Sequence, residues 1–114
     1  MQTYNRTIYK YESDGFKAIP TIDYSGWELK YMIKKSKTDR DIDALLSITP
    51  TFVTESGTVK IQVLFLPENL ESISDGKYWH ALKVISSDKT QAKFLLGGIC
   101  TITSGGIDYP AEVA

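Results

Sequence analysis

Apolar and polar side chains alternate along much of this chain. The alternation is clearest between residues 27 and 34, where every second side chain is apolar. A period of two is typical of a β-strand that buries one face and exposes the other. The residues between the apolar ones are therefore expected to face solvent. The expected buried row is Trp27, Leu29, Tyr31 and Ile33.

The same period predicts two further strands, at residues 58–66 and 77–85. A fourth strand is predicted over about 91–103, which is rich in Leu, Ile and Thr. The short polar segment 86–90 joins the last two and predicts a hairpin. From the strand after Gly57, we expect these side chains to share a core with the first row: Val59, Ile61 and Val63.

Several remaining segments also have β character. Thr3–Tyr11 and Gly15–Ile19 predict strands near the N-terminus, and Leu45–Thr54 predicts a strand interrupted by Pro50. Proline confines that strand to an edge or a bulge, and the terminal position of Thr3–Tyr11 makes it a second candidate edge. Pro67–Ile73 is the helical candidate, with proline at the first turn and acidic residues early.

Short strands with turn signals about every ten residues predict an all-β fold, either an antiparallel sandwich or a small barrel. A parallel α/β sheet is disfavoured because the sequence lacks the crossover helices that such a sheet requires. The chain has 114 residues, a length that suits one hydrophobic core. We therefore expect a single domain over residues 1–114.

Composition narrows the class of protein. The net charge of −1 argues against nucleic acid as the main partner, because phosphate binding needs a basic surface. Cys100 is the only cysteine, so no intrachain disulfide is expected. The first ten residues lack the apolar core of a signal peptide, and no apolar run approaches the ~20 residues that span a bilayer. We expect a soluble protein made in the cytoplasm.

The charge is divided unevenly along the chain. Residues 1–40 carry eight basic and five acidic side chains, a balance of +3, whereas residues 41–114 carry five and nine, a balance of −4. If the two halves stayed apart in the fold, they would favour head-to-tail assembly through unlike surfaces. Folding of the chain back on itself would instead cancel the difference.

His80 and Cys100 are the residues from which a reactive site would have to be built. A Cys100–His80 nucleophile pair is one hypothesis, but Cys100 lies in an apolar run and is better interpreted as a small buried side chain. One histidine and one cysteine supply too few ligands for a metal site. We predict no catalytic, metal-binding or cofactor-binding residues.

Two charged clusters and a glycine pair receive structural interpretations. Asp39, Asp41 and Asp43 alternate as in a calcium loop, but the sixth position lacks glycine and the twelfth is Pro50 instead of glutamate. This segment is interpreted as a solvated loop. The same interpretation holds for the basic cluster before it, which offers no row of interleaved aromatic side chains for stacking bases. The members of this cluster are Lys30, Lys34, Lys35, Lys37 and Arg40. Paired glycines at Gly97–Gly98 predict a bulge or a close backbone approach.

A set of short motifs resembles a known family. Tyr24–Ile33 is similar to a recurring stretch of small phage proteins, where a polar turn precedes a Trp-x-Leu-x-Tyr strand. The order continues with a strand after glycine (Gly57–Leu66), a Pro-Glu-x-Leu turn of helix (Pro67–Leu70), Gly76–Tyr78, a hairpin, and Leu95–Ile99. Together these resemble the immunoglobulin-like structural proteins of tailed bacteriophages, including the N-terminal domain of baseplate upper proteins.

The resemblance implies an immunoglobulin-like antiparallel β-sandwich with one short helical turn, and it covers most of residues 15–103. It also implies a non-enzymatic structural or assembly protein of a phage or prophage virion, acting by binding other virion proteins or itself, with no nucleic acid or membrane as partner. Baseplate proteins of this kind continue into fibre segments, whereas this chain stops at Ala114. A head–tail, tail or accessory position is therefore expected.

A different class of function stays open beside this one. Seven tyrosines and two tryptophans would also suit a β-domain that binds a small molecule or a carbohydrate. An enzyme would instead require His80 to meet carboxylates in a cleft.

Overall fold

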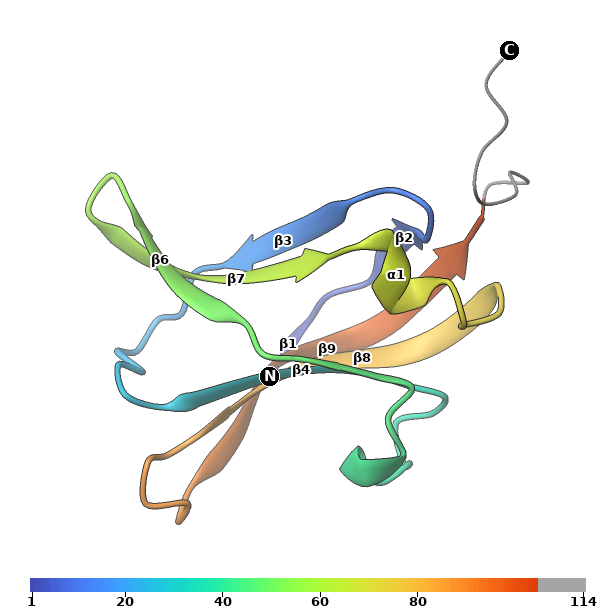
Figure 1. Ribbon diagram of the computed structural model, residues 1–114. Coiled ribbons are helices and arrows are strands. Elements are labelled where there is room, and N and C mark those ends of the chain that lie inside the picture. The colour runs from blue at the N-terminus through green and yellow to red at the C-terminus, as the bar shows by residue number, and fades with distance from the viewer. Residues whose placement is uncertain (105–114) are drawn as a thin grey trace.

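The computed structural model describes residues 1–104, which form two β-sheets packed face to face (Figure 1). Sheet A is six-stranded and sheet B is three-stranded. The expected all-β sandwich is confirmed. The strands of sheet A are β1 (Gln2–Thr3), β2 (Arg6–Tyr9), β4 (Glu28–Lys34), β5 (Leu46–Ile48), β8 (Gly76–Ile85) and β9 (Ala92–Thr103). Those of sheet B are β3 (Asp14–Ala18), β6 (Thr51–Glu55) and β7 (Thr58–Phe65).

The strand order is that of an immunoglobulin domain. Sheet A runs β1-β9-β8-β4-β5 with β2 also on β9, and sheet B runs β3-β7-β6. If β3 to β9 are given the letters B, C, C′, D, E, F and G in turn, these orders become G-F-C-C′ and B-E-D, the two sheets of that fold. Pairing is antiparallel at every junction from β3 onward.

The N-terminal segment departs from the predicted antiparallel pairing. Residues 3–11 were expected to form one strand, but two short strands, β1 and β2, both pair parallel to β9. The break falls at Tyr4 and Asn5, where the Asn5 side-chain oxygen accepts the Ile99 N–H at 2.9 Å. A parallel neighbour is available here because the whole sandwich separates β2 from β9 along the chain, which supplies the long connection that parallel strands need.

The outer face of β4 is less exposed than the alternation predicted. Met32 and Lys34 are buried, although both belong to the row expected in solvent. The connection between β4 and β5 folds back over this face and contains a 3-10 turn, η1 (Asp41–Asp43). Its Asp41 carboxylate accepts from the Lys34 Nζ at 2.6 Å and from the Lys83 Nζ at 3.0 Å. Tertiary cover therefore replaces solvent at this end of sheet A.

Val59 is not a core residue as predicted. It is 45% exposed, and Leu64 and Leu66, in the opposite row at the far end of the segment, are also exposed. Val59 lies one residue pair from the β6–β7 turn, and this hairpin projects beyond sheet A (Figure 1). The other two predicted core residues of this strand, Ile61 and Val63, are buried, and so is Phe65 two positions further on.

Pro50 marks a change of sheet. The predicted strand Leu45–Thr54 is divided by Thr49 and Pro50 into β5, at the end of sheet A, and β6, at the end of sheet B. Both are edge strands, as the proline predicted. The predicted helix is present as α1 (Pro67–Leu70). No helix within residues 1–104 is long and apolar enough to cross a membrane.

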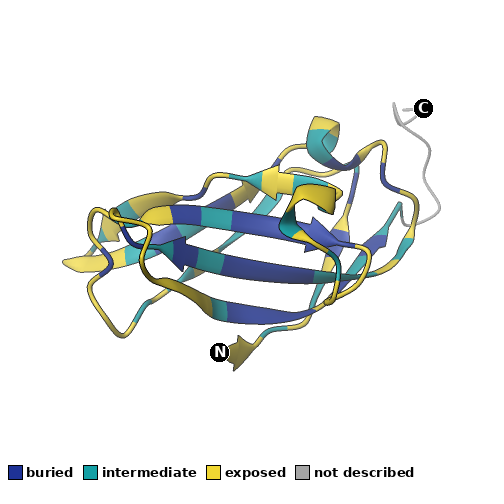
Figure 2. Ribbon diagram, turned by 90° about the horizontal axis from the view of Figure 1, so that it is seen from below, coloured by how far each residue is buried: buried dark blue, intermediate teal, exposed yellow. Residues whose placement is uncertain are grey.

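The core lies between the sheets, where the buried positions of facing strands meet (Figure 2). Leu29, Tyr31 and Ile33 belong to it, whereas Trp27 is half-buried at its margin. The predicted glycine contacts are present. A Cβ on Gly98 would lie 2.4 Å from the Tyr4 carbonyl oxygen, and one on Gly97 would lie 2.7 Å from the Trp79 ring. The β8–β9 register also shifts nearby, between Leu82 and Lys83.

Candidate functional site

His80 is buried, and both of its ring nitrogens have partners. Nδ1 lies 2.6 Å from the Tyr31 hydroxyl, and Nε2 lies 2.6 Å from the Tyr4 carbonyl oxygen. A carbonyl oxygen only accepts, so Nε2 carries the proton and Nδ1 accepts from Tyr31. Burial lowers the pKa of His80, and the nearby Arg6 charge lowers it further. The imidazole is thus a neutral link between β8, β4 and the β1–β2 junction.

Cys100 is buried beside this cluster on β9. Burial raises the pKa of its thiol to about 12, so the reactive thiolate is not favoured at neutral pH. His80 has no free nitrogen with which to accept the thiol proton. The arrangement does not assemble the hypothetical Cys100–His80 pair, and Cys100 has the buried packing role that its apolar surroundings predicted.

His80, Tyr31 and Tyr4 form a buried cluster, and this cluster occupies the place of the disulfide in antibody domains. At the start of β8, the Tyr78 hydroxyl donates to the Ser74 carbonyl oxygen at 2.5 Å, which is the tyrosine corner of the fold. The second disulfide cysteine of those domains lies two residues further on, and here that position is His80. Its ring contacts Tyr31 at 5.6 Å between centroids, and Tyr31 contacts Phe16 of β3 at 5.5 Å. An aromatic and hydrogen-bonded link between the sheets thus replaces a covalent one.

Arg6 extends this link to the edge of sheet B. Its guanidinium donates to the Tyr4 hydroxyl at 2.9 Å, to the Asp14 carboxylate at 2.6 Å and to the Gly15 carbonyl oxygen at 2.9 Å. The hydrogen bonds to Asp14 and Tyr4 raise the pKa of Arg6 against the opposing effect of burial, which is the largest single influence. Arg6 therefore joins β2 to the first half of β3.

The aspartates of the predicted loop serve separate structural roles. Asp39 accepts hydrogen bonds from the Ser36 N–H and hydroxyl, while Asp41 accepts from two lysines, and the Lys34 hydrogen bond is the main cause that lowers its pKa. Within residues 1–104, no group of three His, Cys, Asp or Glu side chains could hold a metal ion. Asp39 and Asp41 thus hold the connection between β4 and β5 through hydrogen bonds and ion pairs.

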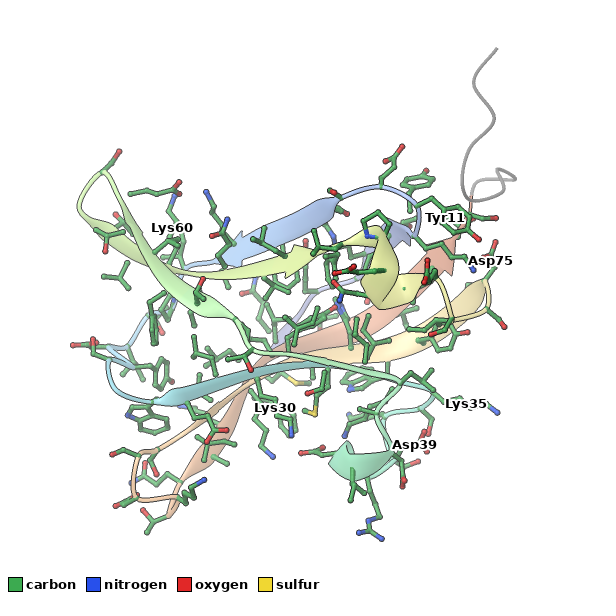
Figure 3. All side chains as sticks on the ribbon, in the orientation of Figure 1. Tyr11, Lys30, Lys35, Asp39, Lys60 and Asp75 are labelled. Carbon is green, nitrogen blue, oxygen red and sulfur yellow. The ribbon has the colours of Figure 1, made fainter. Side chains whose placement is uncertain are left out.

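The lysines of the predicted basic cluster do not form one patch. Lys34 is buried and forms an ion pair with Asp41. Lys30 lies along β4 and Lys35 beyond its end, so the two are well apart in Figure 3. The basic first half and the acidic second half do not stay apart in the fold. Three ion pairs join a base of the first half to an acid of the second, Lys10–Asp75, Lys17–Glu55 and Lys34–Asp41, and Lys89–Glu28 joins the halves with the opposite polarity.

A cleft of about 620 Å³ opens where β3 and the start of β9 face each other across the sandwich. Four aromatic side chains from four segments line it: Tyr4, Phe16, Tyr24 and Phe94. The sequence pattern did not predict this cleft. The aromatic residues were visible, but nothing in the local pattern indicates that these four converge.

No protein-family model matches this sequence, and no curated protein is significantly similar to it.

Proposed function

We propose that this chain is a non-enzymatic structural or assembly protein of a phage or prophage virion, acting by protein–protein binding. The single observation that supports binding is the set of open sheet edges. Strands β5, β6 and β3 each end a sheet, with no further strand from residues 1–104 on their outer side. Unpaired backbone groups at such edges can pair with another chain.

Exposed apolar side chains lie along the same edges. Leu45, next to β5, and Phe52, on β6, are 47% and 36% exposed. Aromatic and aliphatic side chains at an exposed edge suit a protein contact better than solvent. The assignment of the partner to a virion rests on the motif resemblance of residues 15–103.

The test is to purify particles from the source phage or induced prophage and to search for this chain by mass spectrometry. We expect it at a fixed ratio to a structural protein of the particle. A host protein of similar abundance serves as the control for contamination. Absence of the chain from washed particles would contradict the proposal.

The aromatic cleft favours a second candidate, a β-domain that binds a small molecule or a carbohydrate. Its volume lies within the roughly 300–1,000 Å³ typical of ligand sites. Tyr4, Phe16, Tyr24 and Phe94 would supply the ring faces that sugars and flat apolar ligands contact. Specific binding of a sugar or dye to the purified chain, with no particle association, would move this candidate to first place.

A further inference from the structure

We propose that the open half of the β3 edge, together with the aromatic cleft beside it, accepts an extended strand from a partner protein. The partner segment would have alternating apolar side chains and acidic residues next to them. This inference rests on the proposed function and gives its binding site. The two halves of β3 differ in the hydrogen bonds that their outward-facing backbone groups make.

The first half of the β3 edge is closed. The Gly15 N–H donates to the Asp14 carboxylate at 2.8 Å, and the Gly15 carbonyl accepts from Arg6 at 2.9 Å. Neither bond is to β7, so the backbone groups of Gly15 point away from sheet B toward its free edge. The Arg6–Asp14 pair occupies the space in which an added strand would lie.

The second half is open. Backbone groups of successive residues point to alternate edges of a strand, so the N–H and C=O of Lys17 face the same side as those of Gly15. Within residues 1–104, no strand pairs with β3 on this side. The Lys17 side chain is not in the way, because its Nζ reaches across the sheet face to Glu55 on β6 at 2.6 Å. The backbone N–H and C=O of Lys17 are therefore available to a strand of another protein.

The cleft lies directly at this open half. Phe16, Lys17 and Ala18 of β3 line one wall, and Phe94, Leu95 and Leu96 of β9 line the other. Alternate side chains of a strand point to opposite faces. A strand paired with Lys17 would therefore direct every second side chain into the cleft, where apolar groups would contact Phe16 and Leu96. Backbone pairing with pockets for alternate side chains is the mode of β-augmentation.

The charge of the cleft lining indicates which charge the partner strand carries. Among the side chains that line the cleft, Lys17 and Lys93 are charged and none is acidic. Glu55 already engages Lys17, so Lys93, which is exposed at the rim, is the cation that selects the partner. An apolar strand with a carboxylate beside it complements this surface, whereas a basic strand is repelled.

The probe is a short acetylated peptide in which valine alternates with threonine, ending in glutamates. It is titrated into isotope-labelled protein and followed by NMR. We expect the Lys17 amide signal to shift and its hydrogen exchange to slow, while the exchange of the Gly15 amide stays unchanged. A second peptide carries N-methyl groups on the amides that would face β3, and we expect it to lose measurable binding, because it cannot pair with the edge.

A matched pair of variants tests the charge preference. Lys93→Glu should weaken binding of the glutamate peptide by about two- to fivefold, the range of one exposed ion pair. Lys35→Glu makes the same charge change at an exposed site outside the cleft and should leave binding unchanged. No shift of the Lys17 amide, or equal binding of the N-methylated peptide, would overturn the edge-strand proposal. Binding of aromatic small molecules alone would overturn it in favour of a ligand cleft.

The peptide experiments and the particle experiment can fail independently of each other. If the chain is found in particles but the Lys17 amide does not respond to the peptide, the virion role stands and this site is wrong. If peptide binding follows the expected pattern but the chain is absent from particles, the strand site stands and the virion role is wrong.

Discussion

At the residue scale, a crowded glycine and a buried histidine hold the N-terminal strands in place. Gly98 faces the backbone of the β1–β2 junction so closely that no side chain fits. His80 holds the same junction through the Tyr4 carbonyl oxygen. Both residues therefore attach the N-terminal strands to the rest of sheet A. Substitution of either should change the stability of the fold.

Gly98→Ala should reduce the free energy of unfolding by about 1–3 kcal/mol, the usual cost of overpacking. The added Cβ would lie 2.4 Å from the Tyr4 carbonyl oxygen, and backbone cannot easily move aside. Gly76→Ala is the matched control, since its nearest contact, the Tyr78 ring, lies at an ordinary 3.6 Å. Denaturant unfolding of both variants measures the difference. Equal midpoints for the two would show that the β1–β2 junction is not held as described.

Stability should fall in mildly acidic solution because of His80. Its pKa is lowered in the folded state, so as the pH drops below about 6.5 the unfolded chain takes up a proton more readily than the folded one. The contribution is complete above that pH and is lost as the pH falls toward the folded pKa. The difference in unfolding free energy between pH 7.5 and pH 5.5 should be smaller in His80→Gln, which cannot titrate. An unchanged difference would contradict a neutral, buried His80.

At the element scale, short connections are fixed by single hydrogen bonds. The chain leaves β7 through α1 and enters β8 at the tyrosine corner, where the Tyr78 hydroxyl holds the Ser74 carbonyl. Such a bond fixes the path between the two sheets, because it ties the first residues of β8 to the connection that precedes them.

Tyr78→Phe removes this bond and keeps the ring. We expect a loss of about 0.5–1.5 kcal/mol in unfolding free energy, the usual net value of one hydrogen bond. Tyr9→Phe is a suitable control, because Tyr9 is half exposed and loses only a solvent-facing hydroxyl. Thermal and denaturant unfolding of the pair provide the measurement. A Tyr78→Phe protein as stable as the control would mean that the corner does not contribute.

At the scale of the whole molecule, ion pairs join basic side chains of residues 1–40 to acidic side chains of residues 41–104, so the two halves do not form separate charged surfaces. The isolated protein should therefore keep the same mass in light-scattering experiments at low and high salt. A mass that fell as salt increased would indicate assembly through unlike charged surfaces, against the distribution of ion pairs seen here.

His80→Ala and Cys100→Ser should lower stability while leaving particle association intact, provided that the variants are assayed below their unfolding temperature. Both side chains are buried in the core, and truncation of buried groups costs roughly 1–3 kcal/mol or more. Loss of particle association by a folded variant would instead revive a chemical role for the pair.

The sequence by itself determined most of the strands. Period-two alternation located β4, β7 and β8, the Leu, Ile and Thr content located β9, and Pro50 marked two edge strands, because these signals depend on local geometry and on the burial of one face. The helical turn at Pro67 and the close approach at Gly97–Gly98 were also predictable, since proline and glycine restrict or permit particular backbone conformations.

Only the tertiary structure decided which faces are covered. Met32 and Lys34 are buried because a later loop returns over them, and Val59 is exposed because its hairpin extends past the other sheet. The parallel pairing of β1 and β2, the partners of His80 and the aromatic cleft have the same origin. Each depends on contacts between residues far apart in sequence, and alternation along one strand carries no information about what lies opposite it.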